Sequence, residues 1–108
     1  IPMSSPPPLI PCPDCEYYRK MVDDLGDIAM RVHEFVTDEL TSGVTREQVR
    51  LTFELTLEKA LGVATRTRMR CEIEAKERPR HGDFIPELEE IISLYERTLA
   101  MCRPAVGA

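Results

Sequence analysis

The chain has 108 residues, of which 43% are hydrophobic and 31% charged, which predicts one folded domain rather than a disordered chain. Its net charge of -5 opposes binding to nucleic acid or an anionic membrane, because like charges repel. No run approaches the roughly 20 consecutive apolar residues of a membrane span, and no secretory signal pattern is present. We therefore expect a cytoplasmic protein without membrane contact, in which thiols stay reduced.

The first segment, residues 1–13, contains six prolines. Proline has no amide donor for a helix or a central strand, so this segment is predicted to be an N-terminal tail. The folded domain is expected to span residues 14–104.

A first helix is predicted at about residues 14–41. Asp14 can cap its start, and Gly43 can take the positive φ angle that ends a helix. The apolar residues recur every three or four positions and form one broad stripe, which predicts the core face. That stripe contains Tyr18, Met21, Val22, Leu25, Ile28, Ala29, Val32, Phe35, Val36 and Leu40.

A second helix is predicted at about residues 45–78, between the capping box of Thr45 and Gln48 and the helix-ending Pro79. Its main apolar stripe contains Val49, Phe53, Leu57, Ala60, Leu61, Val63, Ala64, Cys71 and Ala75. Further apolar residues lie on roughly the opposite side, and they are Leu51, Leu55, Met69 and Ile73. Because one partner helix cannot cover both faces, we expect this second face to form a protein interface, and the protein to be a homodimer.

A third helix is predicted at about residues 84–103, with Asp83 as its cap. Its stripe contains Leu88, Ile91, Ile92, Tyr95, Leu99 and Cys102. The connections at 42–44 and 79–83 are short, and short connections favour antiparallel neighbours. The expected fold is all-α: an antiparallel three-helix bundle with long helices.

A structural zinc site is one hypothesis for the cysteines. Cys12 and Cys15 form a CPDC pair, and the descent of the second helix returns Cys71 to their level, with His81 in the next connection. Three thiolates and one imidazole suit a closed tetrahedral zinc site. A Cys12–Cys15 disulfide or unreactive thiols are the alternatives. Cys102 is expected in the core.

A nucleic-acid surface is a second hypothesis, because basic residues gather late in the second helix. Its contacts would come from Arg66, Arg68, Arg70, Arg78 and Arg80. Intervening glutamates favour ion pairs within the helix instead. A third hypothesis, a helical metal-dependent hydrolase, rests on Glu87 and Glu90, but these face away from the apolar stripe.

The sequence therefore favours a non-enzymatic helical protein-protein interaction module, such as a small adaptor or regulator. It is expected to self-associate through the second helix, with zinc as its one candidate cofactor. Its expected partner is another protein, a second copy of itself, or both.

Overall fold

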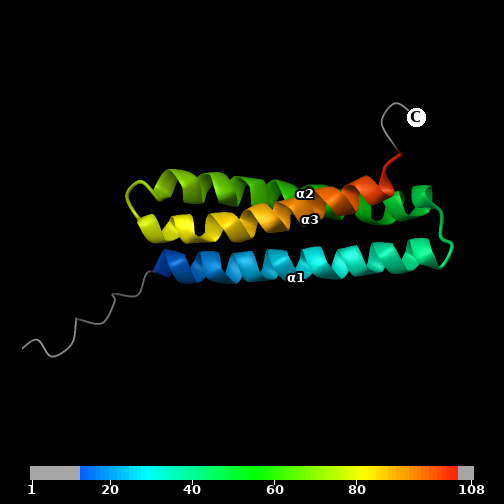
Figure 1. The fold of residues 1–108 in the computed structure, drawn as a ribbon, viewed down its shortest axis with the longest axis horizontal. Coiled ribbons are helices and arrows are strands. Elements are labelled where there is room, and N and C mark those ends of the chain that lie inside the picture. The colour runs from blue at the N-terminus through cyan, green and yellow to red at the C-terminus, as the bar shows by residue number, and fades with distance from the viewer. Residues whose placement is uncertain (1–12, 105–108) are drawn as a thin grey trace, which may run out of the picture.

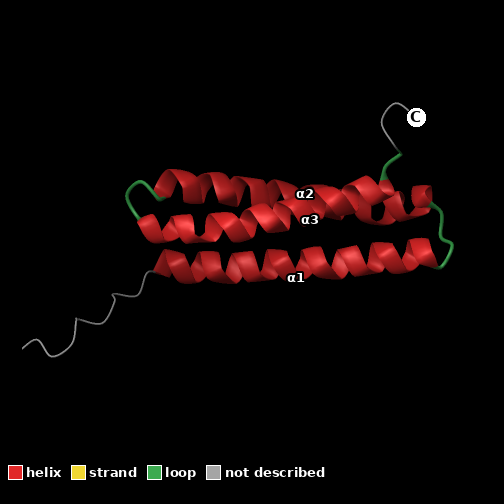
Figure 2. Ribbon diagram, in the orientation of Figure 1, coloured by secondary structure: helices red, strands yellow, loops and turns green. Residues whose placement is uncertain are grey.

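The computed structural model describes residues 13–104, and in this range three α-helices follow one another with no strand (Figure 2). They are α1 (Pro13–Thr41), α2 (Arg46–Glu74) and α3 (Ile85–Cys102), with a short 3-10 helix, η1 (Pro79–Phe84), before α3. The all-α prediction is confirmed for this part of the chain. The proposed tail lies outside the described residues except for Pro13, which opens α1, where its missing amide costs nothing.

The three helices lie side by side and alternate in direction along the chain (Figure 1). Both α1 and α2 have 29 residues, a length of about 43 Å, whereas α3 has 18 residues. In the part of the chain described, no helix combines the length and apolar character that a membrane span requires.

The core follows the predicted stripes, with steps of three and four residues that are typical of a bundle seam. On α1 the buried residues are Tyr18, Val22, Leu25, Ala29, Val32 and Val36. On α2 they are Val49, Leu57, Ala64, Thr67 and Cys71, and on α3 they are Leu88, Tyr95, Thr98, Leu99 and Cys102. Two members of the predicted α1 stripe are not in the core, since Ile28 is 41% and Phe35 58% exposed. They lie at the edge of the stripe, where a large part of each side chain reaches solvent.

The turn between α1 and α2 is set by a glycine. Gly43 has a φ angle of 95°, and the amide of Val44 donates to the carbonyl of Glu39 at 3.0 Å. The Gly43 amide donates to Leu40 at 3.3 Å, which completes a Schellman motif. Thr45 then caps α2, because its hydroxyl accepts from the Gln48 amide at 3.2 Å.

The end of α2 and the start of α3 differ from the prediction. The α-helix stops at Glu74 rather than at about 78, and residues 75–78 form a tighter turn. Arg78 has a φ of -130° and a ψ of 86°, outside the helical region, because Pro79 disfavours helix in the residue that precedes it. Asp83 lies within η1, and no side-chain hydrogen bond caps α3.

Candidate functional site

The second apolar face of α2 points to solvent in the single chain. We call it the outer face of α2 and define it by Leu51, Leu55, Met69 and Ile73. These side chains are 72%, 63%, 52% and 65% exposed, respectively. The core residues of the same helix, such as Leu57 and Ala64, are fully buried. At about 100° per residue the two sets lie on opposite sides of the helix, as the sequence predicts.

Neighbouring helices cover the other sides of α2. Towards α1, the Thr67 hydroxyl lies 3.2 Å from the sulfur of Met21. Towards α3, the guanidinium of Arg68 lies 3.3 Å from the carboxylate of Glu89. The outer face of α2 lies on the side away from both contacts and is left uncovered within one chain.

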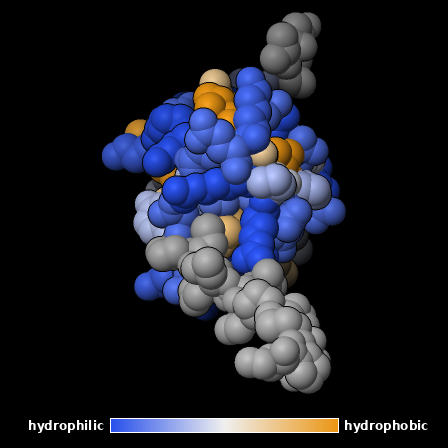
Figure 3. Space-filling model, turned by 90° about the vertical axis from the view of Figure 1, so that its left-hand side faces the viewer, coloured by the Kyte–Doolittle hydropathy of each residue, from blue (hydrophilic) through white to orange (hydrophobic). Residues whose placement is uncertain are grey.

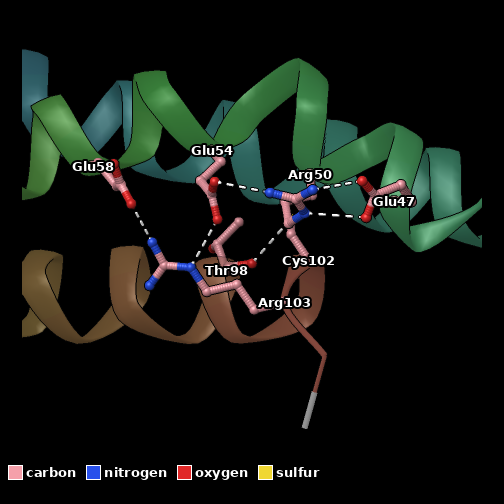
Figure 4. A network of polar contacts seen from close by, with 7 residues as sticks. All are labelled: Glu47, Arg50, Glu54, Glu58, Thr98, Cys102 and Arg103. Carbon is pink, nitrogen blue, oxygen red and sulfur yellow. Dashed lines mark hydrogen bonds and ion pairs between the residues drawn. The ribbon is translucent and has the colours of Figure 1, made fainter. Parts of the chain in front are cut away.

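A polar network borders this face on the α3 side (Figure 4). Arg103, just after α3, bonds to Glu54 at 2.9 Å and also pairs with Glu58. Arg50 links Glu54 to Glu47 through hydrogen bonds along α2. The hydrogen bond from Arg103 lowers the pKa of Glu54 below its usual value. The network ties the end of α3 to α2 without covering the apolar side chains.

Two of the five arginines proposed for nucleic acid pair with carboxylates, and the other three are exposed. Arg68 pairs with Glu89 on α3, and Arg78 pairs with Asp14 at the start of α1. These two cations thus have carboxylate partners on other elements. Arg66 and Arg70 are exposed one turn apart on α2, and Arg80 is exposed in η1. Part of the predicted set is thus paired with carboxylates, and the nucleic-acid contacts stay a prediction.

A buried polar cluster lies at the end of the bundle where α1 begins and α2 ends. The Tyr18 hydroxyl is 2.8 Å from both carboxylate oxygens of Glu74 and donates to them. His81 is fully buried, with its Nδ1 3.2 Å from a Glu74 oxygen and its ring 5.1 Å from the Tyr18 ring. Burial and then the hydrogen bond to Glu74 raise the pKa of Tyr18 to about 12. These contacts join α1, α2 and η1.

The predicted zinc ligands are placed only in part. Cys71 and His81 are buried and Cys15 is half-buried, whereas Cys12 lies outside the described residues. Within residues 13–104, no group of three or more His, Cys, Asp or Glu side chains could hold a metal ion. Burial also raises the pKa of the Cys71 thiol, which disfavours the thiolate that zinc requires. The zinc site therefore stays a prediction that depends on Cys12. As expected, Cys102 lies in the core.

The surface of this end is mainly hydrophilic, with apolar atoms in small separate areas (Figure 3). The described residues that are visible in this view form no broad apolar patch. Of the glutamates considered for metal-dependent hydrolysis, Glu87 pairs with Arg19 at 2.8 Å and Glu90 is exposed. Neither belongs to a metal-holding group among the described residues.

A shallow groove between α1 and α2 was not expected from the sequence. Its apolar lining includes Tyr17, Met21, Ile28 and Val63. The sequence assigned Met21, Ile28 and Val63 to core stripes, because periodicity alone does not separate the centre of a stripe from its edge. The 55% exposure of Tyr17 shows that this groove is open to solvent.

Comparison of the chain with protein-family models, with curated proteins and with solved structures found no match.

Proposed function

We propose that the protein is a non-enzymatic helical interaction module that binds protein through the outer face of α2 and self-associates by the same face. One observation carries this proposal: four large apolar side chains on one side of α2 are each more than half exposed. Burying such a side chain contributes at most about 1.5–3 kcal/mol, before the costs of association. A helix with apolar residues on two opposite sides is stable in water when something covers both.

Sedimentation of the full chain tests the proposal. A Leu55→Glu variant puts a charge within the outer face and is expected to sediment as a monomer, whereas wild type sediments as a larger species. The matched control is Ser93→Glu, which adds the same charge at an exposed position on α3. It is expected to behave as wild type. If wild type and Leu55→Glu are both monomers, self-association through α2 is wrong.

The zinc clip is a separate part of the proposal and is tested by metal analysis of the native protein. About one zinc per chain is expected, and Cys12→Ser is expected to remove it. The support is that Cys71 lies in the last turn of α2, and that the ring of His81 lies 5.1 Å from the ring of Tyr18 near the start of α1. A metal-free native protein would contradict the clip but would leave the α2 interface in place.

A further inference from the structure

The outer face of α2 is arranged symmetrically about one residue, Gly62. Leu51 and Ile73 lie eleven positions on either side of it. Leu55 and Met69 lie seven positions on either side. The face is about 33 Å long from its first to its last apolar residue. When a second copy of α2 is laid antiparallel on the first, with a two-fold axis at Gly62, each apolar residue meets an apolar residue.

The charges on this face have the same symmetry with opposite signs. Glu58 lies four positions before Gly62 and Arg66 four positions after it, and all three are on the outward side of α2. Both charged side chains are exposed. In the antiparallel arrangement Glu58 of each copy faces Arg66 of the other, which gives two identical ion pairs. A parallel, in-register pair would place Glu58 against Glu58 and Arg66 against Arg66, and such like-charge contacts are unfavourable.

The glycine at the centre fits a crossing of two helices. Gly62 has no side chain, so two backbones can approach closely there. The nearest side-chain atom to a Cβ built on Gly62 is Nη1 of Arg66, at 3.3 Å. The guanidinium of Arg66 thus lies over the glycine in the single chain. Because it is the far end of an exposed side chain, it can swing away to the carboxylate of a second copy.

We infer that the occupant of the outer face of α2 is a second copy of the same chain, bound antiparallel with its two-fold axis at Gly62. The inference rests on the proposed function and specifies its partner and register. Isologous contacts of this kind close the assembly at two copies, because each copy uses the same face. The observation that carries it is the combined apolar and charge symmetry of one exposed helix face.

Charge reversal tests the pairing. Arg66→Glu places carboxylates opposite Glu58 at two symmetric positions and is expected to raise the dimer dissociation constant roughly tenfold at low salt. The Glu58→Arg, Arg66→Glu double variant exchanges the signs and is expected to recover most of the lost affinity. Glu58→Arg alone also removes the partner of Arg103, so Arg66→Glu is the cleaner single change. Equal weakening by the single and double variants overturns the pairing.

Cysteine cross-linking tests the direction of the helices. In a chain whose Cys12 and Cys15 are replaced by serine, Leu55→Cys and Met69→Cys are made separately. Mixing the two variants under oxidising conditions is expected to give a disulfide-linked dimer, whereas each variant alone gives none, because identical positions lie about 20 Å apart in the antiparallel pair. Cross-linking within either variant alone overturns the antiparallel register. The proposed function is tested separately by sedimentation. If wild type dimerises and Leu55→Glu does not, self-association through α2 holds even when the cross-linking contradicts the antiparallel register.

Discussion

The hydroxyl of Tyr95 on α3 donates a 2.7 Å hydrogen bond to the backbone carbonyl of Leu25 on α1. It is a direct polar contact across the buried interior between these two helices, and Tyr95 itself is fully buried. Burial raises the pKa of its phenol to about 12, so the group stays neutral over the physiological range.

Removing this hydroxyl is expected to weaken the fold. Tyr95→Phe should lower the free energy of unfolding by about 1 kcal/mol, because one buried hydrogen bond is lost with little change in volume. Denaturant unfolding followed by circular dichroism measures this. The control is Tyr17→Phe, whose side chain is 55% exposed and should leave the midpoint unchanged. Equal effects of both variants would contradict the assigned role of the bond.

Two leucines on α2 separate the core side from the outer side. Leu57 is fully buried and Leu55 is 63% exposed. Leu57→Ala is expected to cost about 2–5 kcal/mol of unfolding free energy through lost burial and the cavity left behind. Leu55→Ala is expected to change the unfolding free energy by less than about 0.5 kcal/mol, when it is measured at a protein concentration too low for dimers to form. If Leu55→Ala cost more stability than Leu57→Ala, α2 would have to be rotated about its axis relative to this structure.

The turn after α1 gives a test of backbone strain without a packing change. A Cβ at Gly43 meets nothing within 4 Å, but its φ of +95° is unfavourable for any residue with a side chain. Gly43→Ala should therefore destabilise the protein by about 1 kcal/mol. In Gly82→Ala the added Cβ makes an ordinary 3.5 Å contact with Ala75, and φ is not positive, so thermal unfolding should change little.

Alkaline pH is expected to destabilise the fold through the buried phenols. The folded-state pKa of Tyr18 is about 12, against 10 for an ordinary tyrosine. A raised pKa stabilises the fold fully below pH 10, and this contribution is lost as the pH rises from 10 through 12, because the unfolded chain releases the proton first. The loss is on the order of 2 kcal/mol for each such phenol.

Unfolding experiments between pH 9 and pH 12 measure this dependence. Tyr18→Phe should remove about half of the stability loss at alkaline pH, since the buried phenol of Tyr95 contributes a similar part of that loss. The double variant with Tyr95→Phe should remove most of it. An unchanged pH dependence in the double variant would show that other groups are responsible.

Helix existence, order and turn chemistry could be predicted from the sequence because they depend on local signals. Thr45 caps α2 through its hydroxyl, and Gly43 ends α1 because a residue without a side chain can take a positive φ angle. The four residues of the outer face of α2 were predicted for the same reason, since helical spacing alone fixes which side of a helix a residue occupies.

Other features depend on neighbours that the sequence does not place. Thr67 and Thr98 are buried although threonine is polar, because each hydroxyl donates to the carbonyl four residues earlier and needs no solvent. Phe35 is exposed although it is aromatic, because it lies at the edge of the α1 stripe. The Tyr18–Glu74 hydrogen bond spans 56 positions and depends on how α1 and α2 pack.

The two sides of α2 share one continuous helix, and this constrains where the chain can change length. Deleting or inserting one residue inside α2 rotates everything beyond it by about 100°. Such a change would move Cys71 out of the interior and at the same time misalign Met69 and Ile73 relative to Leu51 and Leu55. Residues 42–45 and 75–78 lie outside the α-helices. Single-residue insertions are therefore expected to be tolerated in these connecting segments and to destabilise the protein when they fall inside the helices.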